Sequence, residues 1–314
     1  METNFYKKLF KSISSIFNHS ITPEIMHRID EEVFYFEKKD CIEYLIQASN
    51  YIEELRNSLG TEHCVHARGA MGGSLVLYLL GINDLNPLKR YRTGYRYAGG
   101  WPIEEGFDLS FDIFKYEFEK HNYVLSVSYY KDSFDIEFDG KPFRFVHSDT
   151  TATLFKFFYL IPNDFKDGLV TYDNFIIKYQ DIVALDEALA SYTGRYNVKS
   201  FDEEVKIHAL LWGVDVVENN QKIGRMELDD MICTSDDLFN ILKIKIGKDR
   251  AAKICVCNSV GKKCIDSLKK YGVEDSIIKF VRNKKYMLSK SYAVIRARKL
   301  IMILAIREAE KHAK

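Results

Sequence analysis

The sequence predicts an α/β protein of the α+β type, in which helices flank a small mixed β-sheet and a helical domain follows. Apolar residues recur at helical spacing between residues 22 and 59, and again beyond about residue 197. Residues 91–162 are instead rich in aromatic, β-branched and turn residues, as strands require. We therefore expect two domains, over residues 1–195 and 196–314, with a boundary near Ser191 to Ser200.

The first helical region begins with a capping signal. Thr22 precedes Pro23 and Glu24, and proline is favoured at the first position of a helix. Charged residues then alternate with apolar ones from Ile25 to Ile52, which predicts amphipathic helices.

A glycine-rich turn follows in the stretch RGAMGGSLVLYLLGINDLNPL, residues 68–88, and leads into an apolar helix. Glycines let an anionic ligand approach the backbone, and the amides at the start of a helix attract negative charge. Arg68 and Ser74 add donors at the same place. Arg68, Gly72, Gly73 and Ser74 are thus candidates for binding phosphate or nucleotide, although the same pattern also serves tight packing and capping.

The strand-rich region carries two turn signals. Two period-two runs on either side of residues 131–133 predict a hairpin, and Asp139-Gly140 marks a second turn. Asp135, Glu137 and Asp139 alternate along one strand, which favours a solvated polar face over a set of metal ligands.

Composition excludes several classes of protein. The 45 basic and 45 acidic residues cancel, so nucleic-acid binding requires a local patch. Six irregularly spaced cysteines predict free thiols in a reducing cytoplasm, and Cys255, Cys257 and Cys264 lack a fourth ligand for a zinc site. The apolar stretch around residues 300–306 is too short to cross a bilayer, so we expect a cytoplasmic protein without a membrane partner.

The glycine-rich stretch resembles the segment R-G-S-x-x-G-S-L-V-x-Y-x-L-x-I-T-D-x-x-P-L of the C-family bacterial replicative DNA polymerases, represented by the DNA polymerase III alpha subunit. Ala70 and Asn83 depart from the family's Ser and Thr. Later segments resemble the fingers of the PolC branch, including KYMLSKS at residues 285–291, where Lys290 and Ala293 match. The resemblance implies a palm of the nucleotidyltransferase type with a shortened middle insertion, followed by helical fingers.

The family's palm uses carboxylates to hold two Mg²⁺ ions, and this chain matches that set incompletely. Asp108 falls at the second family carboxylate, whereas Gly106 stands where the first belongs. Asp112 shares a strand face with Asp108, but four residues separate them by roughly 13 Å, too far to bridge two metals. The third position falls on Tyr179 or Gln180, and only a shift of register would recruit Asp181. The candidate catalytic residues are Asp108, Asp112 and Asp181, and Asp108 and Asp112 are the candidate Mg²⁺ ligands.

A basic run near the C-terminus supplies the remaining candidates. Lys285 and Lys290 lie among several lysines and arginines that could neutralise triphosphate or DNA charge, or simply form a solvated helix face.

Together these features predict a stand-alone palm-and-fingers relative of PolC, with impaired catalysis, that binds deoxynucleoside triphosphate, DNA or both, beside possible replication proteins. One alternative is an active nucleotidyltransferase that uses Mg²⁺. Another is a non-catalytic structural or regulatory partner in a DNA replication assembly.

Overall fold

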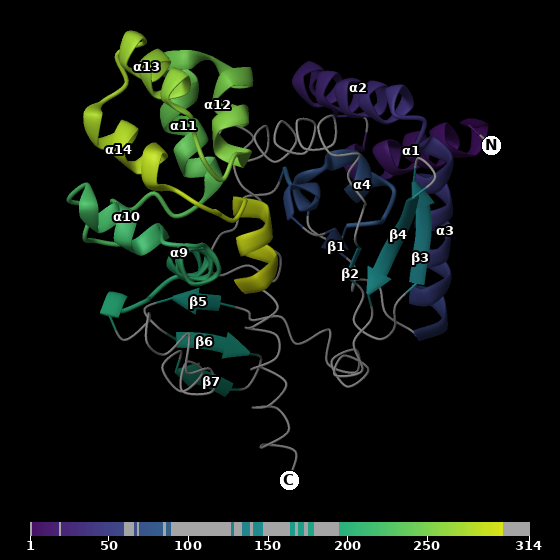
Figure 1. The fold of residues 1–314 in the computed structure, drawn as a ribbon. Coiled ribbons are helices and arrows are strands. Elements are labelled where there is room, and N and C mark those ends of the chain that lie inside the picture. Colours follow the sequence, from purple (N-terminus) through teal and green to yellow (C-terminus); the bar gives the residue numbers. More distant parts are fainter. Residues whose placement is uncertain are drawn as a thin grey trace.

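Helices account for most of the chain that the computed structural model describes (Figure 1). The described residues are 2–18, 20–59, 66–67, 69–83, 86–88, 127–128, 134–138, 141–146, 164–166, 169–172, 175–178 and 195–297. Figure 1 shows the N-terminal helices beside β3 (Phe134–Phe138) and β4 (Lys141–Val146), while the helices within residues 201–283 gather on the opposite side.

The N-terminal helices are α1 (Glu2–Phe17), α2 (Pro23–Lys38) and α3 (Ile42–Leu59). The predicted cap of α2 is confirmed, because Thr22 Oγ1 accepts a hydrogen bond from the Ile25 amide at 3.4 Å. A short 3-10 helix, η1 (Gly69–Gly73), leads into α4 (Leu75–Leu79). Side chains from these helices are buried together, among them Phe5, Phe36, Ile52 and Leu75.

The strands that the structure describes form two separate sheets. The first has the order β1-β2-β4-β3 and consists of β1 (His66–Ala67), β2 (Val127–Ser128), β3 (Phe134–Phe138) and β4 (Lys141–Val146). The second is an antiparallel meander of β5 (Asp164–Lys166), β6 (Leu169–Tyr172) and β7 (Phe175–Lys178).

Strand pairing agrees with one predicted turn and differs at the other. The strands on either side of Asp139-Gly140 pair antiparallel, with Phe138 opposite Lys141. The hairpin predicted around residues 131–133 is not formed by the described strands, because β2 pairs in parallel with β4 instead of with β3. Period-two patterning identifies strands but does not choose their partners.

The predicted fold class is wrong for the described part of the chain, which is predominantly helical and shows no central palm sheet. Its strands have two to six residues, and none of them contains the carboxylate segment predicted at residues 105–111. The buried side chains that the structure describes lie on helices and on the segments between them. Packing between helices therefore sets this architecture, and the strand-forming runs pair in short strands beside the helices.

The helical pattern predicted beyond residue 197 is confirmed for the described residues, which extend to residue 297. It comprises α9 (Phe201–Trp212), α10 (Val216–Lys222), α11 (Ser235–Ile246), α12 (Lys248–Val256), α13 (Lys262–Lys270), α14 (Asp275–Asn283) and a further helix over residues 290–297. Reciprocal capping boxes begin α9 and α11, formed by Ser200 with Glu203 and by Thr234 with Asp237. The domain boundary at residues 195 and 196 remains a prediction.

Removing the cap of α9 tests how much local sequence signals contribute to this fold. Ser200→Ala leaves the Glu203 amide without its side-chain acceptor and should lower the free energy of unfolding by about 1 kcal/mol. Urea denaturation followed by circular dichroism measures the change. Ser14→Ala, at an exposed position within α1, is the control and should change stability by less than about 0.5 kcal/mol. Equal effects of the two substitutions would contradict the capping role.

Candidate functional site

The glycine-rich turn forms as predicted, by η1 running directly into α4. Gly72, Gly73 and Ser74 are all buried, and Ser74 is the N-cap of α4. Its Oγ accepts a hydrogen bond from the Leu77 amide at 3.2 Å. Arg68, the other predicted donor, lies outside the described residues. The predicted helix is short, since α4 ends at Leu79.

A buried carboxylate of the chain itself occupies the start of α4. Glu32, on α2, is fully buried and accepts hydrogen bonds from Ser74 Oγ at 2.7 Å, the Val76 amide at 2.9 Å and the Leu75 amide at 3.2 Å. These are the donors that the sequence assigns to a phosphate. In this conformation an internal anion satisfies them.

Arg28 balances the buried charge of Glu32 from one turn earlier on α2. Its Nε lies 2.5 Å from Glu32 Oε1, and Nη2 lies 3.5 Å from the Gly73 carbonyl oxygen. Both side chains are at least nine-tenths buried. A buried ion pair of this kind holds its geometry only when further hydrogen bonds complete it, as Ser74 and the two amides do here. We call Arg28, Glu32 and Ser74 the α2–α4 lock.

A second buried carboxylate meets the other predicted phosphate-binding segment. Asp236, near the start of α11, accepts a hydrogen bond from the Lys290 amide at 2.6 Å, at the first residue of helix 290–297. Burial raises the pKa of Asp236 to about 7, because water no longer solvates its charged form. The hydrogen bond from Lys290 opposes that shift.

Lys284 and Lys285 are adjacent in sequence but have opposite environments. Lys284 is buried, and its Nζ donates to the carbonyl oxygens of Cys255 and Cys257 at the end of α12. Burial lowers the pKa of Lys284. Lys285 is exposed and lies 2.7 Å from Asp215 Oδ2, which raises the pKa of that lysine. The first lysine therefore fixes the segment, and the second remains at the surface.

Aromatic and cationic side chains gather beside Lys285. Trp212 ends α9 with 47% of its side chain exposed, and Tyr286 is 46% exposed. The Arg296 guanidinium carbon lies 3.8 Å from the centre of a Trp212 ring, a cation–π arrangement. We call Trp212, Lys285, Tyr286 and Arg296 the Trp212 surface.

The backbone fixes the two parts of the Trp212 surface against each other. Val214 donates its amide to the Tyr286 carbonyl oxygen at 2.9 Å. The turn before Val214 requires glycine at position 213, since a Cβ there would lie 2.5 Å from Val216 Cγ2 and 2.9 Å from the Ala209 carbonyl oxygen. Any other residue would have to push these groups apart.

The predicted metal ligands are not brought together by the described part of the chain. Asp108, Asp112 and Asp181 all lie outside it. Asp135 and Glu137 are on β3, opposite Arg144 and Pro142 of β4. Among the described residues, no three acidic, histidine or cysteine side chains are placed to hold a metal ion. The role of Mg²⁺ stays a prediction.

In a comparison with known protein families, the chain matches the bacterial DNA polymerase III alpha NTPase domain over residues 3–311. The chain belongs to this family. The match supports the predicted polymerase ancestry without distinguishing the PolC branch. No curated protein matches the chain. Within the described residues of this DNA polymerase III alpha family member, no helix is long and apolar enough to cross a membrane.

Sequence reasoning missed the two carboxylates that organise this family member's candidate site. In the sequence, Glu32 and Asp236 look like the many acidic residues that are exposed to solvent. Their buried hydrogen-bond partners, which the structure shows, distinguish them from those residues. One signal was available for Glu32: it follows Arg28 by four residues and lies next to Ile29 and Val33 on the face that α2 buries. A charged pair at this spacing beside an apolar stripe indicates a buried ion pair.

Neutralising Glu32 should weaken the contact between α2 and the glycine-rich turn. Glu32→Gln keeps the side-chain shape but leaves Arg28 buried without its counter-charge, so the free energy of unfolding should fall by about 3 kcal/mol in urea denaturation. Glu31→Gln removes the neighbouring exposed carboxylate and should change stability by less than about 0.5 kcal/mol. A loss at Glu32 no larger than at Glu31 would rule out the α2–α4 lock.

The raised pKa of Asp236 makes a prediction about pH. The folded protein holds this proton up to about pH 7, whereas the unfolded chain releases it near the usual value of 3.8. The stability from Asp236 is thus complete below about pH 4 and is lost as the pH rises through about 7. Between pH 5 and pH 7, the wild type should lose about 2 kcal/mol relative to Asp236→Asn, which cannot ionise. Urea denaturation across this range measures the difference. Asp249→Asn, at an exposed position, is the control, and its free energy of unfolding should differ from that of the wild type by the same amount at every pH. The prediction is refuted if the difference between Asp236→Asn and the wild type is also independent of pH.

Proposed function

We propose that this DNA polymerase III alpha family member binds single-stranded DNA through the Trp212 surface and is impaired in nucleotidyl transfer. The observation that carries the proposal is the cation–π pair of Trp212 and Arg296 beside exposed Tyr286 and Lys285. Proteins that bind single strands stack bases on exposed aromatic rings and neutralise the backbone with nearby cations.

The way this surface is built supports binding without rearrangement. Lys284 fixes the segment before helix 290–297, and Asp236 binds the first amide of that helix. Arg296 also donates to the Tyr292 hydroxyl at 3.1 Å, which holds its guanidinium over the Trp212 ring. Side chains held in place before binding lose less conformational entropy when they engage a ligand. An incoming deoxynucleoside triphosphate could use the same cations, and the likeness of residues 285–291 to PolC fingers favours that branch.

The impairment rests on the sequence of the predicted carboxylate positions. Gly106 has no side chain, and neither Tyr179 nor Gln180 provides a carboxylate. Two-metal phosphoryl transfer needs carboxylates that bridge both ions. Of the three family carboxylate positions, only the one matched by Asp108 holds a carboxylate in this sequence, and one carboxylate does not supply the set that two metal ions require.

Binding is tested by fluorescence anisotropy with a labelled single strand of about twenty nucleotides. Trp212→Ala removes a stacking surface worth about 1–3 kcal/mol and should weaken binding by about tenfold or more. Phe34→Ala, which truncates a 66% exposed aromatic side chain on α2, is the matched control and should leave the affinity unchanged. Equal affinities of wild type and Trp212→Ala would overturn this part of the proposal.

Primer extension with Mg²⁺ and the four deoxynucleoside triphosphates tests the second part. We expect no extension by the wild type. Extension that Asp108→Ala abolishes would show an active polymerase and overturn the impairment, while leaving the binding result intact.

A further inference from the structure

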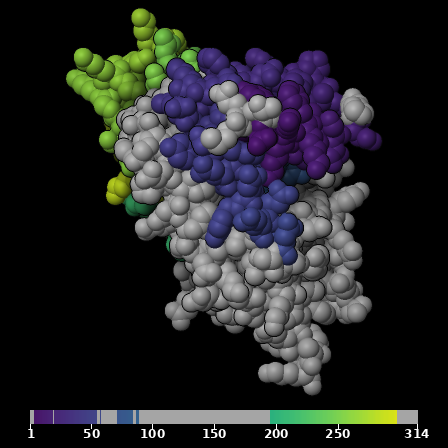
Figure 2. Space-filling model, turned by 90° about the vertical axis from the view of Figure 1, so that its right-hand side faces the viewer, coloured from purple at the N-terminus to yellow at the C-terminus, as the bar shows by residue number. Residues whose placement is uncertain are grey.

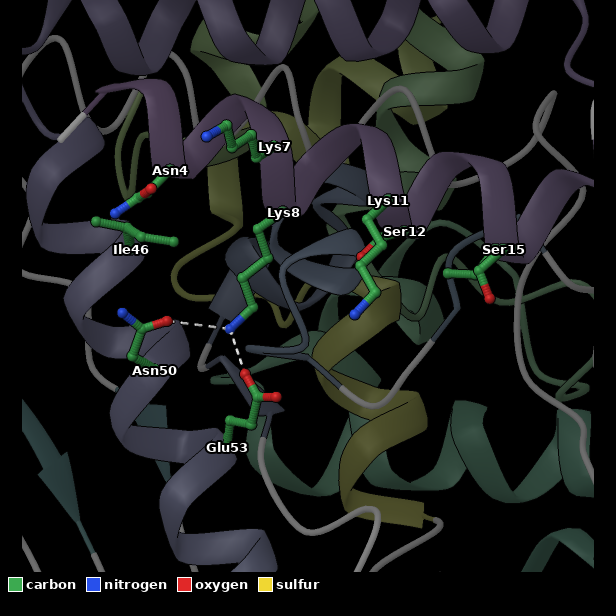
Figure 3. A pocket seen from close by; sticks show the side chains of 10 residues that line it. Asn4, Lys7, Lys8, Lys11, Ser12, Ser15, Ile46, Asn50 and Glu53 are labelled. Carbon is green, nitrogen blue, oxygen red and sulfur yellow. Dashed lines mark hydrogen bonds and ion pairs between the residues drawn. The ribbon is translucent and has the colours of Figure 1, made fainter.

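We propose that the groove between α1 and α3 binds the phosphate backbone of a nucleic-acid strand, as a contact separate from the Trp212 surface. The groove encloses 520 Å³ (Figure 3). Its lining comes from two helices: Asn4, Lys7, Lys8, Lys11, Ser12, Ser15 and Ile16 of α1, and Ile46, Asn50 and Glu53 of α3. We call this the α1 groove.

The sequence of α1 places one polar stripe along this groove. Positions 4, 7, 8, 11, 12 and 15 follow helical spacing, so their side chains share a face. The opposite, apolar face is buried at Phe5 and Leu9, which fixes the rotation of the helix. Figure 2 shows the N-terminal helices, coloured purple to blue, exposed together on one side of the molecule. Asn4, Lys7, Lys11 and Ser15 are exposed, so the polar stripe is open to a ligand.

One of the three lysines is held in position by α3. Lys8 Nζ lies 2.7 Å from Glu53 Oε2 and 3.2 Å from Asn50 Oδ1, so it joins the two walls (Figure 3). Lys11 extends into the same space beside Lys8 in Figure 3. Lys7 and Lys11 are exposed, and no described carboxylate forms an ion pair with either. The groove therefore keeps an excess of positive charge in a chain whose net charge is zero.

The shape of the stripe favours a polymer over a single phosphate. The twelve residues from Asn4 to Ser15 extend along the helix for roughly 16 Å, and Lys7 and Lys11 are about 6 Å apart along its axis. Successive phosphates of one strand can meet such a row of ammonium, amide and hydroxyl donors. Membrane binding is less well supported, because Phe5 and Leu9 of α1 are packed inside the molecule and cannot enter a bilayer, which leaves only Phe10 and Ile16 as exposed large apolar side chains among the described residues of α1.

The test is the salt dependence of binding to a labelled single strand between about 50 and 200 mM KCl. Lys7→Gln with Lys11→Gln should reduce the slope of log affinity against log salt by about 1.4, as expected for two lost phosphate contacts to a single strand. Lys7→Arg with Lys11→Arg should retain the wild-type slope. The control, Lys269→Gln with Lys270→Gln, removes two exposed lysines of α13 and should also retain it.

An unchanged slope in the Lys7 and Lys11 glutamine variant would overturn the inference. The inference would also be overturned if this variant lost binding to anionic phospholipid vesicles while its binding to DNA was unaffected. The groove would then bind a membrane surface. Trp212→Ala should lower the affinity without changing the slope, so failure of the proposed stacking surface and failure of the α1 groove give different results. Circular dichroism melting confirms that each variant is folded.

Discussion

The contact between Glu32 and the start of α4 is the constraint on which the N-terminal part of the structure depends. Burying a carboxylate is unfavourable by several kcal/mol, so it persists only where donors and a counter-charge surround it. Arg28, Ser74 and two backbone amides provide these. Through these hydrogen bonds Glu32 connects α2 to the glycine-rich turn, at the point where η1 ends and α4 begins. The turn is thus held from inside the protein before any ligand arrives.

The C-terminal helices repeat this principle with different residues. Asp236 joins α11 to the start of helix 290–297, and Lys284 joins the segment before that helix to the end of α12. Each buried side chain satisfies backbone groups that a helix end leaves open. Because these internal contacts fix the backbone, the side chains between them are carried to the surface in a fixed arrangement. Lys285 and Tyr286 lie beside Trp212 for this reason.

The sequence predicted features that depend on neighbouring residues and missed those that depend on distant ones. The Thr22 cap, the pairing across Asp139-Gly140 and the glycine turn follow from local backbone preferences. The partner of β2 and the helical character of the architecture depend on packing between segments far apart in the chain. The same holds for Glu32, which reaches Ser74 across 42 residues. Lys285 and Lys290 are both predicted to bind phosphate, but the structure gives them different contacts. The side chain of Lys285 pairs with Asp215, whereas the backbone amide of Lys290 donates to Asp236.

Lys284 and Asp236 fix the backbone on either side of Lys285 and Tyr286, which belong to the surface proposed to contact DNA. The account depends most directly on Glu32 holding the start of α4. Amide hydrogen exchange at Leu75 and Val76, compared between wild type and Glu32→Gln, tests this contact. Both amides should exchange slowly in the wild type and much faster in the variant, while the amides of α9 stay protected. Rapid exchange at Leu75 and Val76 in the wild type, or equal rates in both proteins, would contradict it.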